Sequence, residues 1–435
     1  MNRYVVLIMI FIGMIWPVSG QGELLTLDQA ISIALENNFD INIARNTSEI
    51  NKNNTGFGNA GLLPTLQFSN TYSWTNSDIQ TELVSGINTE SNNAISTAGN
   101  TKLELKSNLF SGGKNYQSYR KLQNISELSR LTSISVTENI LVAVISSYYS
   151  VVLQTERLRI ARFTLEISQS RLNRIKSKVE FGGTPEIDLL NAHVDMNSDS
   201  ISVLDATLQL KNARRELNHI LNRPIESDFN VDSQIILDFN DNREHWMKLA
   251  VENNIGIRSS QLKAQQSEMD AKIARASYFP NIYGTVSYSK SESESDFSEI
   301  HWQDNVGLSV GLNLSVDLFN GFRNKTQVEN ANIKFRSEII QLKQHESNLQ
   351  KDLLKAWSEW ENEVFTLAVS RQSLETARIN FNRSRELFDL GQISTTAFRE
   401  AQLNLVKSEN RVVTVQYSAK LAEVRLHKLS SQLIP

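Results

Sequence analysis

The chain has 435 residues, no cysteine and a formal net charge of -4. Disulfides and thiolate metal sites are therefore excluded, and the slightly acidic balance provides no basic surface of the kind that binds nucleic acid. Glycine and proline are scarce, with 18 and 6 residues, so long uninterrupted elements are expected, because these two residues are the usual breaks in helices and strands.

The first 20 residues have the anatomy of a secretory signal peptide. Arg3 precedes an apolar run from Val5 to Trp16, and small residues follow as far as Gly20. The run is shorter than the roughly 20 residues that a membrane-spanning helix needs, so we expect export rather than anchoring. No later segment is expected to be apolar enough for a transmembrane helix.

A glycine pattern, G-x-G-x-x-G, occupies Gly56, Gly58 and Gly61. In dinucleotide-binding enzymes this pattern joins a strand to a helix, so that the pyrophosphate lies at the helix N-terminus. Here a polar helical pattern precedes the glycines and an alternating run follows Pro64, which is the reverse order. The sequence therefore predicts a glycine-rich turn between a helix and a strand rather than a nucleotide site.

An internal repeat relates the two halves of the chain. The segment ALENNFDI from Ala34 recurs as AVENNIGI from Ala250, and NLFSGGKN from Asn108 recurs as DLFNGFRN from Asp317. The second copy has no glycine at the positions of the G-x-G-x-x-G pattern, so a nucleotide site would be confined to one copy. The repeat makes that alternative the less favoured one.

Each copy predicts the order helix, β-hairpin, very long helix, turn and helix. We expect a first repeat over 21–222, an inter-repeat linker in the equatorial region over 223–242, and a second repeat over 243–435. The predicted strands span about 65–77, 99–111, 281–293 and 303–319, and the predicted tip turns span about 181–186 and 390–395.

The predicted strands alternate strictly between apolar and polar residues. In the last of them, Val306, Leu308 and Val310 alternate with Gly307 and Ser309. A sustained period of two predicts a strand with one apolar and one polar face. Its length exceeds the roughly 5–6 residues of globular sheets and suits the about 9–11 residues of a transmembrane strand, with a soluble sandwich as the alternative. The polar segments from Asn76 to Asn100 and from Ser289 are expected to be external loops.

The segment from Gly113 to Glu180 has no glycine or proline after its first residue. It predicts a helix approaching about 100 Å, at about 1.5 Å per residue. Apolar residues recur every seven positions there, and the equivalent positions of the second copy are also apolar: Val144, Val151, Leu158, Leu165, Leu172 and Val179, then Leu353, Trp360, Leu367, Leu374, Phe381 and Phe388. This repeat predicts left-handed coiled-coil packing, with antiparallel partner helices from about Ile187 and Thr395.

Four long strands in one chain are too few to enclose a pore, because the smallest membrane barrels have about eight. We therefore expect the chain to oligomerise. Three copies of four strands would give a barrel of about 12 strands above a matching ring of helices.

These features together resemble the TolC-like outer membrane efflux protein family, the outer membrane factors, over essentially the whole mature chain. The residues that carry the resemblance are LTLDQAISIALENN, the LLP and YFP segments before the strands, NLFSGGKN and DLFNGFRN, and the turns FGGTPEIDLLNA and LGQISTTAFREA. The resemblance implies a mixed α and β membrane protein. It implies a homotrimer whose β-barrel spans the outer membrane of a Gram-negative bacterium and continues as a periplasmic α-helical barrel.

The resemblance also implies the function and the partners. Members of the family are exit ducts for inner-membrane pumps of the resistance-nodulation-division or ABC type, which they meet through a periplasmic adaptor, or membrane fusion protein. They are not enzymes, and no cofactor, metal or nucleic acid is implied. The barrel would be surrounded by outer membrane lipid.

The periplasmic tip, where the duct narrows, is expected at the two turns. By resemblance, Asp188 matches a position that helps to hold the closed tip. Glu400 falls at one of two acidic rings at the constriction, whereas Ala397 occupies the other. Three Glu400 carboxylates around a narrow lumen would attract cations and make conductance sensitive to pH. Adaptor docking is expected at Gly182, Gly183, Thr184, Gly391, Gln392 and Ser394.

Plain helix capping is the alternative explanation of the tip residues. Thr184 or Ser394 would be N-caps, Pro185 would be the first helical residue, and acidic side chains would favour the positive helix N-terminus. Both explanations remain open at this point.

Other functional classes are less well supported. A soluble periplasmic coiled-coil adaptor would share the helical hairpins but would not need apolar strand faces that end in Tyr72 and Trp74. The outer membrane component of type I protein secretion would use the same duct. The six histidines form no catalytic or metal-binding pattern. His193 and Met196 can share a helical face and suggest a Cu(I) or Ag(I) site, but closed metal sites need three or four ligands.

Overall fold

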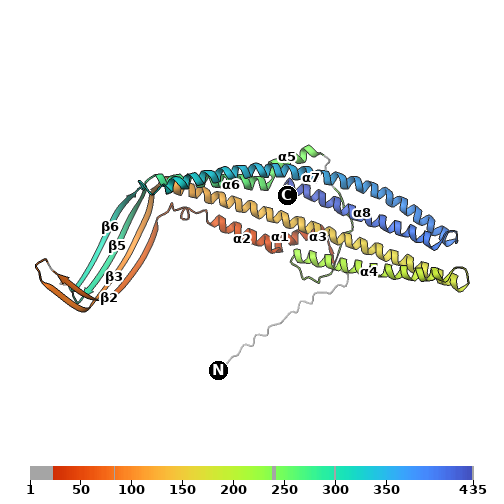
Figure 1. Ribbon diagram of the computed structural model, residues 1–435, viewed down its shortest axis with the longest axis horizontal. Coiled ribbons are helices and arrows are strands. Elements are labelled where there is room, and N and C mark those ends of the chain that lie inside the picture. Colours follow the sequence, from red (N-terminus) through yellow and green to blue (C-terminus); the bar gives the residue numbers. More distant parts are fainter. Residues whose placement is uncertain (1–22, 83, 238–241, 298–299, 434–435) are drawn as a thin grey trace, which may run out of the picture.

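The computed structural model describes residues 23–82, 84–237, 242–297 and 300–433. The predicted signal peptide at 1–20, and residues 238–241 of the predicted linker, lie outside these described residues. The described chain is elongated, with a β-sheet at one end and long helices that extend from it to the other end (Figure 1).

The two halves of the described chain contain the same succession of elements. The first half has β1 (Glu23–Leu25), α1 (Leu27–Asn37), α2 (Phe39–Asn53), β2 (Thr65–Glu82), β3 (Asn88–Ser111), α3 (Lys114–Glu180) and α4 (Glu186–Ile220). The second half has β4 (Phe229–Val231), α5 (Arg243–Asn253), α6 (Ile255–Arg275), the short 3-10 helix η1 (Ala276–Tyr278), β5 (Asn281–Ser295), β6 (Trp302–Ser315), α7 (Arg323–Asp389) and α8 (Thr395–Leu429). The helices α3 and α7 both have 67 residues, and α4 and α8 both have 35.

The four long strands form one antiparallel sheet in the order β2-β3-β5-β6. Its register places Phe68, Leu103, Tyr288 and Leu308 in one row across a single face, and all four side chains are exposed. Because side chains alternate between faces, the neighbouring row is polar. The predicted alternation is therefore present, with its apolar face uncovered in the described chain.

The strands of the first hairpin are longer than predicted. The segment from Asn76 to Asn100, expected to be a loop, is mostly strand, because β2 continues to Glu82 and β3 begins at Asn88. Backbone pairing continues there although both faces are polar, and a period-two pattern detects only strands whose faces differ. In the second hairpin, β6 ends at Ser315, before the predicted end at 319.

The predicted seven-residue repeat is confirmed in both long helices. Val144 and Val151 of α3 and Leu353 and Trp360 of α7 are buried. The remaining repeat positions are buried or half-buried. These positions face the neighbouring helices, as coiled-coil packing requires.

The predicted single helix at the start of each copy is instead two helices. Asn38 has an extended backbone between α1 and α2, and Asn254 occupies the equivalent place between α5 and α6. Each asparagine caps the following helix with its side-chain oxygen. Its side-chain nitrogen donates to a carbonyl at the end of another helix, Ile220 O at 2.9 Å or Leu429 O at 3.0 Å. These bonds place α2 end to end with α4, and α6 end to end with α8.

The helices consequently form four columns in a row. Near the tip turns the order is α4-α3-α8-α7, and near the sheet it is α2-α3-α6-α7. A short parallel pair of strands that was not predicted, β1 with β4, lies at mid-length, where β4 belongs to the predicted linker. The column of α2 and α4 and the helix α7 thus lie at opposite ends of the row.

One expectation about hydropathy is wrong. The helix α3 contains an 18-residue window with a mean hydropathy of 1.5, which is long and apolar enough to cross a membrane. Just over half of that window, 56%, is buried in the fold. Its burial against α1, α4 and α8 accounts for this composition, since core helices of globular proteins have similar windows.

Candidate functional site

The tip turns end the long helices with glycines in the left-handed region. Gly182 has φ +71° and Gly391 has φ +74°. In the first turn, the Gly183 amide donates to Lys178 O at 2.7 Å and the Gly182 amide donates to Val179 O at 3.0 Å, which is the Schellman arrangement. In the second turn the Gln392 amide donates to Leu387 O at 2.8 Å, which is the equivalent of the bond from Gly183 to Lys178. Glycine is needed at both places because a side chain disfavours positive φ.

Asp188 lies between the two turns and binds both. The Thr184 hydroxyl donates to its Oδ2 at 2.7 Å, and the Thr395 hydroxyl of the second hairpin donates to its Oδ1 at 3.3 Å. Asp188 is therefore a bridge within one chain, in addition to its favourable place in the first turn of α4.

The capping alternative is correct for one turn and wrong for the other. Ser394 is the N-cap of α8, and its hydroxyl accepts from the Ala397 amide at 3.2 Å. Thr184 is not an N-cap, because α4 begins at Glu186 and the N-cap residue is Pro185, which has no capping side chain. The Thr184 hydroxyl binds Asp188 instead.

Glu400 is exposed on α8. It makes no hydrogen bond or ion pair with any other residue that the structure describes. No contact among the described residues explains an acid at this position, so its carboxylate is available to the surroundings of the tip. Asp188 and Glu400 are not brought together in one chain, since Asp188 is engaged with the two threonines.

The residue next to Glu400 forms a buried ionic link that the sequence did not reveal. Arg399 of α8 donates twice to Asp199 of α4, with Nη1 to Oδ2 at 2.7 Å and Nη2 to Oδ1 at 3.0 Å. Ser168 of α3 and Gln402 of α8 complete the network, and Gln402 Nε2 reaches the carbonyl of Thr164 at 3.1 Å. The network ties both coiled-coil hairpins together above the tip.

A sequence signal for this link exists. Asp199 follows Ala192 by seven residues, so it occupies the buried stripe of α4, and its side chain is only 8% exposed. A charged residue on a buried stripe needs a partner, because an unpaired buried charge is costly. Which cation it meets depends on how the two helical hairpins pack against each other, which the heptad pattern alone does not specify.

The other patterns noted in the sequence form no reactive site. Gly56, Gly58 and Gly61 lie in the turn between α2 and β2, the helix-to-strand order that was predicted. His193 is exposed, whereas Met196 packs against the apolar cluster near the tip. Within the described ranges, no three His, Asp or Glu side chains are placed to hold a metal ion.

The polar face of the sheet is the second candidate surface. Rows such as Gln67, Glu104, Ser287 and Ser309 carry amide, hydroxyl and charged groups. Glu104 forms an ion pair with Lys102, while Lys106 lies over the ring of Tyr283, 4.4 Å from its centroid. Its polar side chains make this face suitable for contact with water, whereas the apolar side chains of the opposite face are suitable for contact with lipid.

Comparison with known proteins agrees with this geometry. The profile of the family described as "Outer membrane efflux protein" matches residues 30–223 and 246–432. The probable outer membrane lipoprotein SilC of Salmonella typhimurium is 24% identical over 331 residues, which cover 71% of this chain and 68% of SilC. The alkaline protease secretion protein AprF of Pseudomonas aeruginosa is 22% identical over 400 residues, covering 91% of this chain and 82% of AprF.

A solved structure shows the same fold. The Campylobacter jejuni CmeC outer membrane channel superposes with a TM-score of 0.78 at 16% sequence identity, covering 93% of this chain and 85% of CmeC. The two profile matches together span most of the sequence and coincide with the two halves of the fold. The chain belongs to the outer membrane efflux protein family.

Proposed function

We propose that this chain is the exit duct of a tripartite efflux system. It would form a homotrimer in the outer membrane of a Gram-negative bacterium and pass small molecules from an inner-membrane pump and a periplasmic adaptor to the exterior. Each chain would supply one third of the wall, and each of its two repeats would supply half of that third. The family is described as outer membrane efflux proteins, and AprF is named for secretion rather than for catalysis.

The uncovered apolar face of an incomplete sheet carries the proposal. The edge strands β2 and β6 each lack a partner on one side in the described chain. Unpaired backbone groups cannot remain in a bilayer core, so only a closed barrel satisfies them. Four strands are too few for closure, and further copies of the chain supply the missing partners.

The tips are suited to docking a periplasmic adaptor. Phe181 is 88% exposed in the first turn, and Leu390 is 71% exposed in the second. Exposed apolar side chains at a loop tip are typical of contact surfaces. The backbone at Gly182, Gly183, Thr184, Gly391, Gln392 and Ser394 would present these side chains, Asp188 would hold the two turns together, and Glu400 would line the narrow end.

A secretion duct is the second candidate, because AprF is named for alkaline protease secretion. The same barrel and tip would serve an ABC transporter in type I secretion. A soluble periplasmic adaptor is a weaker candidate, because it has no use for the apolar face of the sheet.

Photo-crosslinking in cells distinguishes these functions. A photoreactive amino acid at Gly183 or Gln392 should capture a periplasmic adaptor, identified by mass spectrometry. An adaptor of a proton-driven pump supports efflux, and an adaptor of an ABC transporter supports secretion. Glu90, at the opposite end of the molecule, is the matched control and should capture neither. Recovery of the chain in the soluble periplasmic fraction, with no capture from the tips, would contradict the proposal.

A further inference from the structure

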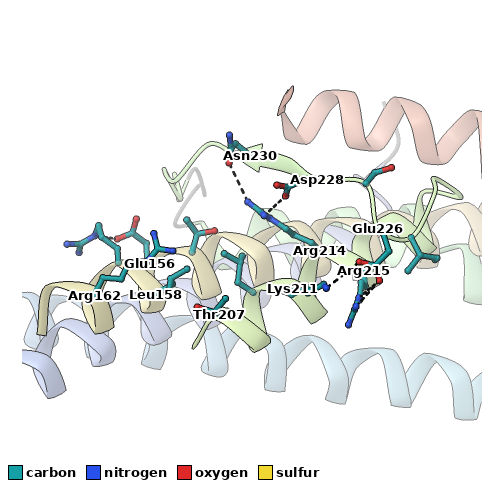
Figure 2. Close-up of a pocket in the computed structure, with 15 residues that line it drawn as sticks. Glu156, Leu158, Arg162, Thr207, Lys211, Arg214, Arg215, Glu226, Asp228 and Asn230 are labelled. Atoms are coloured by element: carbon teal, nitrogen blue, oxygen red, sulfur yellow. Dashed lines mark hydrogen bonds and ion pairs between the residues drawn. The ribbon is translucent and has the colours of Figure 1, made fainter. Parts of the chain in front are cut away.

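A cleft of about 730 Å³ lies between α3, α4 and the segment 225–230 (Figure 2). Its volume falls within the range of small-molecule sites, which is roughly 300–1,000 Å³. The segment 225–230 follows α4 and includes the start of β4, so the cleft lies where the first repeat meets the predicted linker. The duct proposed above gives this cleft no role.

Positive charge is in excess among the side chains that line the cleft. Five of them are cationic, two from α3 and three from α4: Arg159, Arg162, Lys211, Arg214 and Arg215. Three are acidic: Glu156, Glu226 and Asp228. Two positive charges therefore remain without an acidic counterpart in the lining. A cleft with an excess of one charge raises the local concentration of ions of the opposite charge.

Two of the arginines are held by the segment 225–230. Figure 2 shows Arg214 and Arg215 directed toward Asp228 and Glu226. Arg215 donates twice to Glu226 Oε1, from Nη2 at 2.7 Å and from Nε at 3.0 Å. Arg214 forms an ion pair with Asp228, and its guanidinium carbon lies 5.8 Å from the centroid of the Phe229 ring. These contacts fix one wall of the cleft and neutralise its two arginines.

The excess charge resides on one side chain of each helix. On α3, Arg159 donates to Glu156 Oε2 at 2.8 Å, whereas Arg162 is exposed and has no ion pair with another described residue. On α4, Lys211 Nζ lies 3.6 Å from Glu226 Oε2, which is too far for a hydrogen bond of ordinary length. Arg162 and Lys211 are therefore the cations that an incoming anion would meet.

The base of the cleft is apolar. Leu158 of α3 and Leu210 of α4 line the cleft and are both buried, whereas Ile225 lines it and is exposed. Small-molecule sites typically combine such an apolar lining with a few polar groups that fix orientation. The arrangement therefore suits a ligand that has both a carbon skeleton and negative charges, rather than a bare inorganic anion.

We propose that the cleft binds a small organic dianion. Its two negative charges would meet Arg162 and Lys211, and its carbon skeleton would lie on Leu158 and Leu210. A phosphate monoester and a dicarboxylate share this chemistry, and arginine and lysine are the side chains that bind both groups. All the lining residues belong to one chain, so the proposal does not depend on how many copies assemble.

The position of the cleft favours a dissolved ligand over a lipid headgroup. Arg162 lies roughly 70 Å along α3 from Lys114, where this helix leaves the sheet, at about 1.5 Å per residue. The apolar face that suits lipid belongs to the sheet. The headgroups of a membrane around the sheet are therefore too distant to reach Arg162, and the ligand is a soluble one.

Titration calorimetry with three probes that share a benzene ring tests the charge of the ligand. Phenyl phosphate and phthalate are dianions at pH 8, because the second pKa of a phosphate monoester is about 6, whereas benzenesulfonate is a monoanion. At least one dianion should bind the protein in mild detergent at least about fivefold more tightly than benzenesulfonate, because the second charge adds its own attraction. The tighter dianion distinguishes a phosphate ester from a dicarboxylate. Equal affinities for all three probes, or no binding, would overturn the proposal.

Substitution of Arg162 tests the place of binding. Arg162→Gln should weaken binding of the preferred dianion by at least about fivefold, because it removes one of the two unmatched charges. The matched control is Arg120→Gln, the same change at an exposed position of α3 outside the cleft, which should leave the affinity unchanged. Equal affinities of the two variants would show that the dianion binds elsewhere.

Substitution of Glu226 separates a binding role from a structural one. Glu226→Gln removes the acid that competes with the ligand for Arg215 and Lys211, so the affinity for the dianion should rise by about threefold. If the contacts of Glu226 served only to hold the segment 225–230 in place, the same change would lower the affinity or leave it unaltered. Either of those results would overturn the proposed site.

Discussion

Gly112 and Gly321 occupy equivalent turns before the two long helices but have different surroundings. Both have positive φ, +62° and +66°. A Cβ at Gly112 would lie 2.7 Å from the Phe279 Cβ and 2.8 Å from the Ala276 carbonyl oxygen, whereas a Cβ at Gly321 would meet nothing within 4 Å. Glycine is favoured at position 321 only because of its positive φ. At position 112 it is favoured also because there is no room for a Cβ atom.

We expect Gly112→Ala to destabilise the protein more than Gly321→Ala. The backbone strain common to both is about 1–2 kcal/mol, and the collision at Gly112 adds about 1–3 kcal/mol. Thermal unfolding of the two variants measures the difference. Equal midpoints would contradict the close approach of η1 to the strand-helix junction.

The pair formed by Asp199 and Arg399 should behave as one unit. Asp199→Ala leaves the Arg399 guanidinium buried without its main partner, and we expect a loss of about 3 kcal/mol. The double variant Asp199→Ala with Arg399→Ala should lose clearly less than the sum of the two single variants. A double-mutant cycle in denaturant measures the coupling, and strict additivity would show that the pair contributes nothing specific.

Glu138 gives the helical region a pH dependence of known sign. It is buried in α3, and burial raises the pKa of its carboxyl to about 7, while the charge of Lys428 partly opposes this shift. The folded state thus keeps a proton that the unfolded state, with a pKa near 4.3, has already released. The stability that this proton provides is present below about pH 4.3 and is lost as the pH rises from there to about 7.

Glu138→Gln should therefore have little effect on stability near pH 4 and its full effect from about pH 7 upward. The variant should unfold like the wild type near pH 4 and be more stable by about 2 kcal/mol near pH 8. Thermal unfolding across this range measures the difference. A wild type that gains stability relative to the variant as the pH rises would show that Glu138 is ionised in the fold.

At the scale of elements, the asparagine junctions hold the end-to-end helices in line. Asn254→Ala removes both the cap of α6 and the bond to Leu429 O, and we expect a loss of about 1–2 kcal/mol, mainly from the cap. Asn38→Ala should cost a similar amount. Asn53→Ala, an exposed position at a helix end, is the control. Hydrogen exchange at the start of α6 should increase in Asn254→Ala and not in the control, and unchanged protection would contradict the role of the junction.

The type and order of the helices and strands were predictable where an element has its apolar residues on one face and its polar residues on the other. The long helices followed from the absence of glycine and proline and from the heptad repeat, and the strands followed from alternation. The ends of β2 and β3 were missed because both faces are polar beyond Trp74. The break at Asn38 was missed because an asparagine inside a polar helical pattern differs from a cap only through its bond to Ile220 O, a contact distant in the sequence.

The candidate site was predictable only in part. The positions of the turns followed from their glycines and from the duplicated motifs. The pairing of Asp188 with Thr395 and of Asp199 with Arg399 depends on how one hairpin lies beside the other, which no local pattern contains. The roles of Asp188 and Glu400 in holding or lining the tip stay predictions.

At the scale of the whole molecule, the sheet and the row of helices of the described chain each have two open ends. The sheet has two free edges, β2 and β6. The row of helices ends in the column of α2 and α4 on one side and in α7 on the other, and the sheet lies beyond one end of the helices (Figure 1). Such self-complementary, directional edges generate closed rings when the rotation between copies closes.

The mass of the protein extracted from outer membranes in mild detergent tests this account most directly. Native mass spectrometry should give about three times the mass of the processed chain, and the same particles should conduct ions in a planar bilayer. A monomer recovered from the soluble periplasmic fraction, with no conductance, would contradict it.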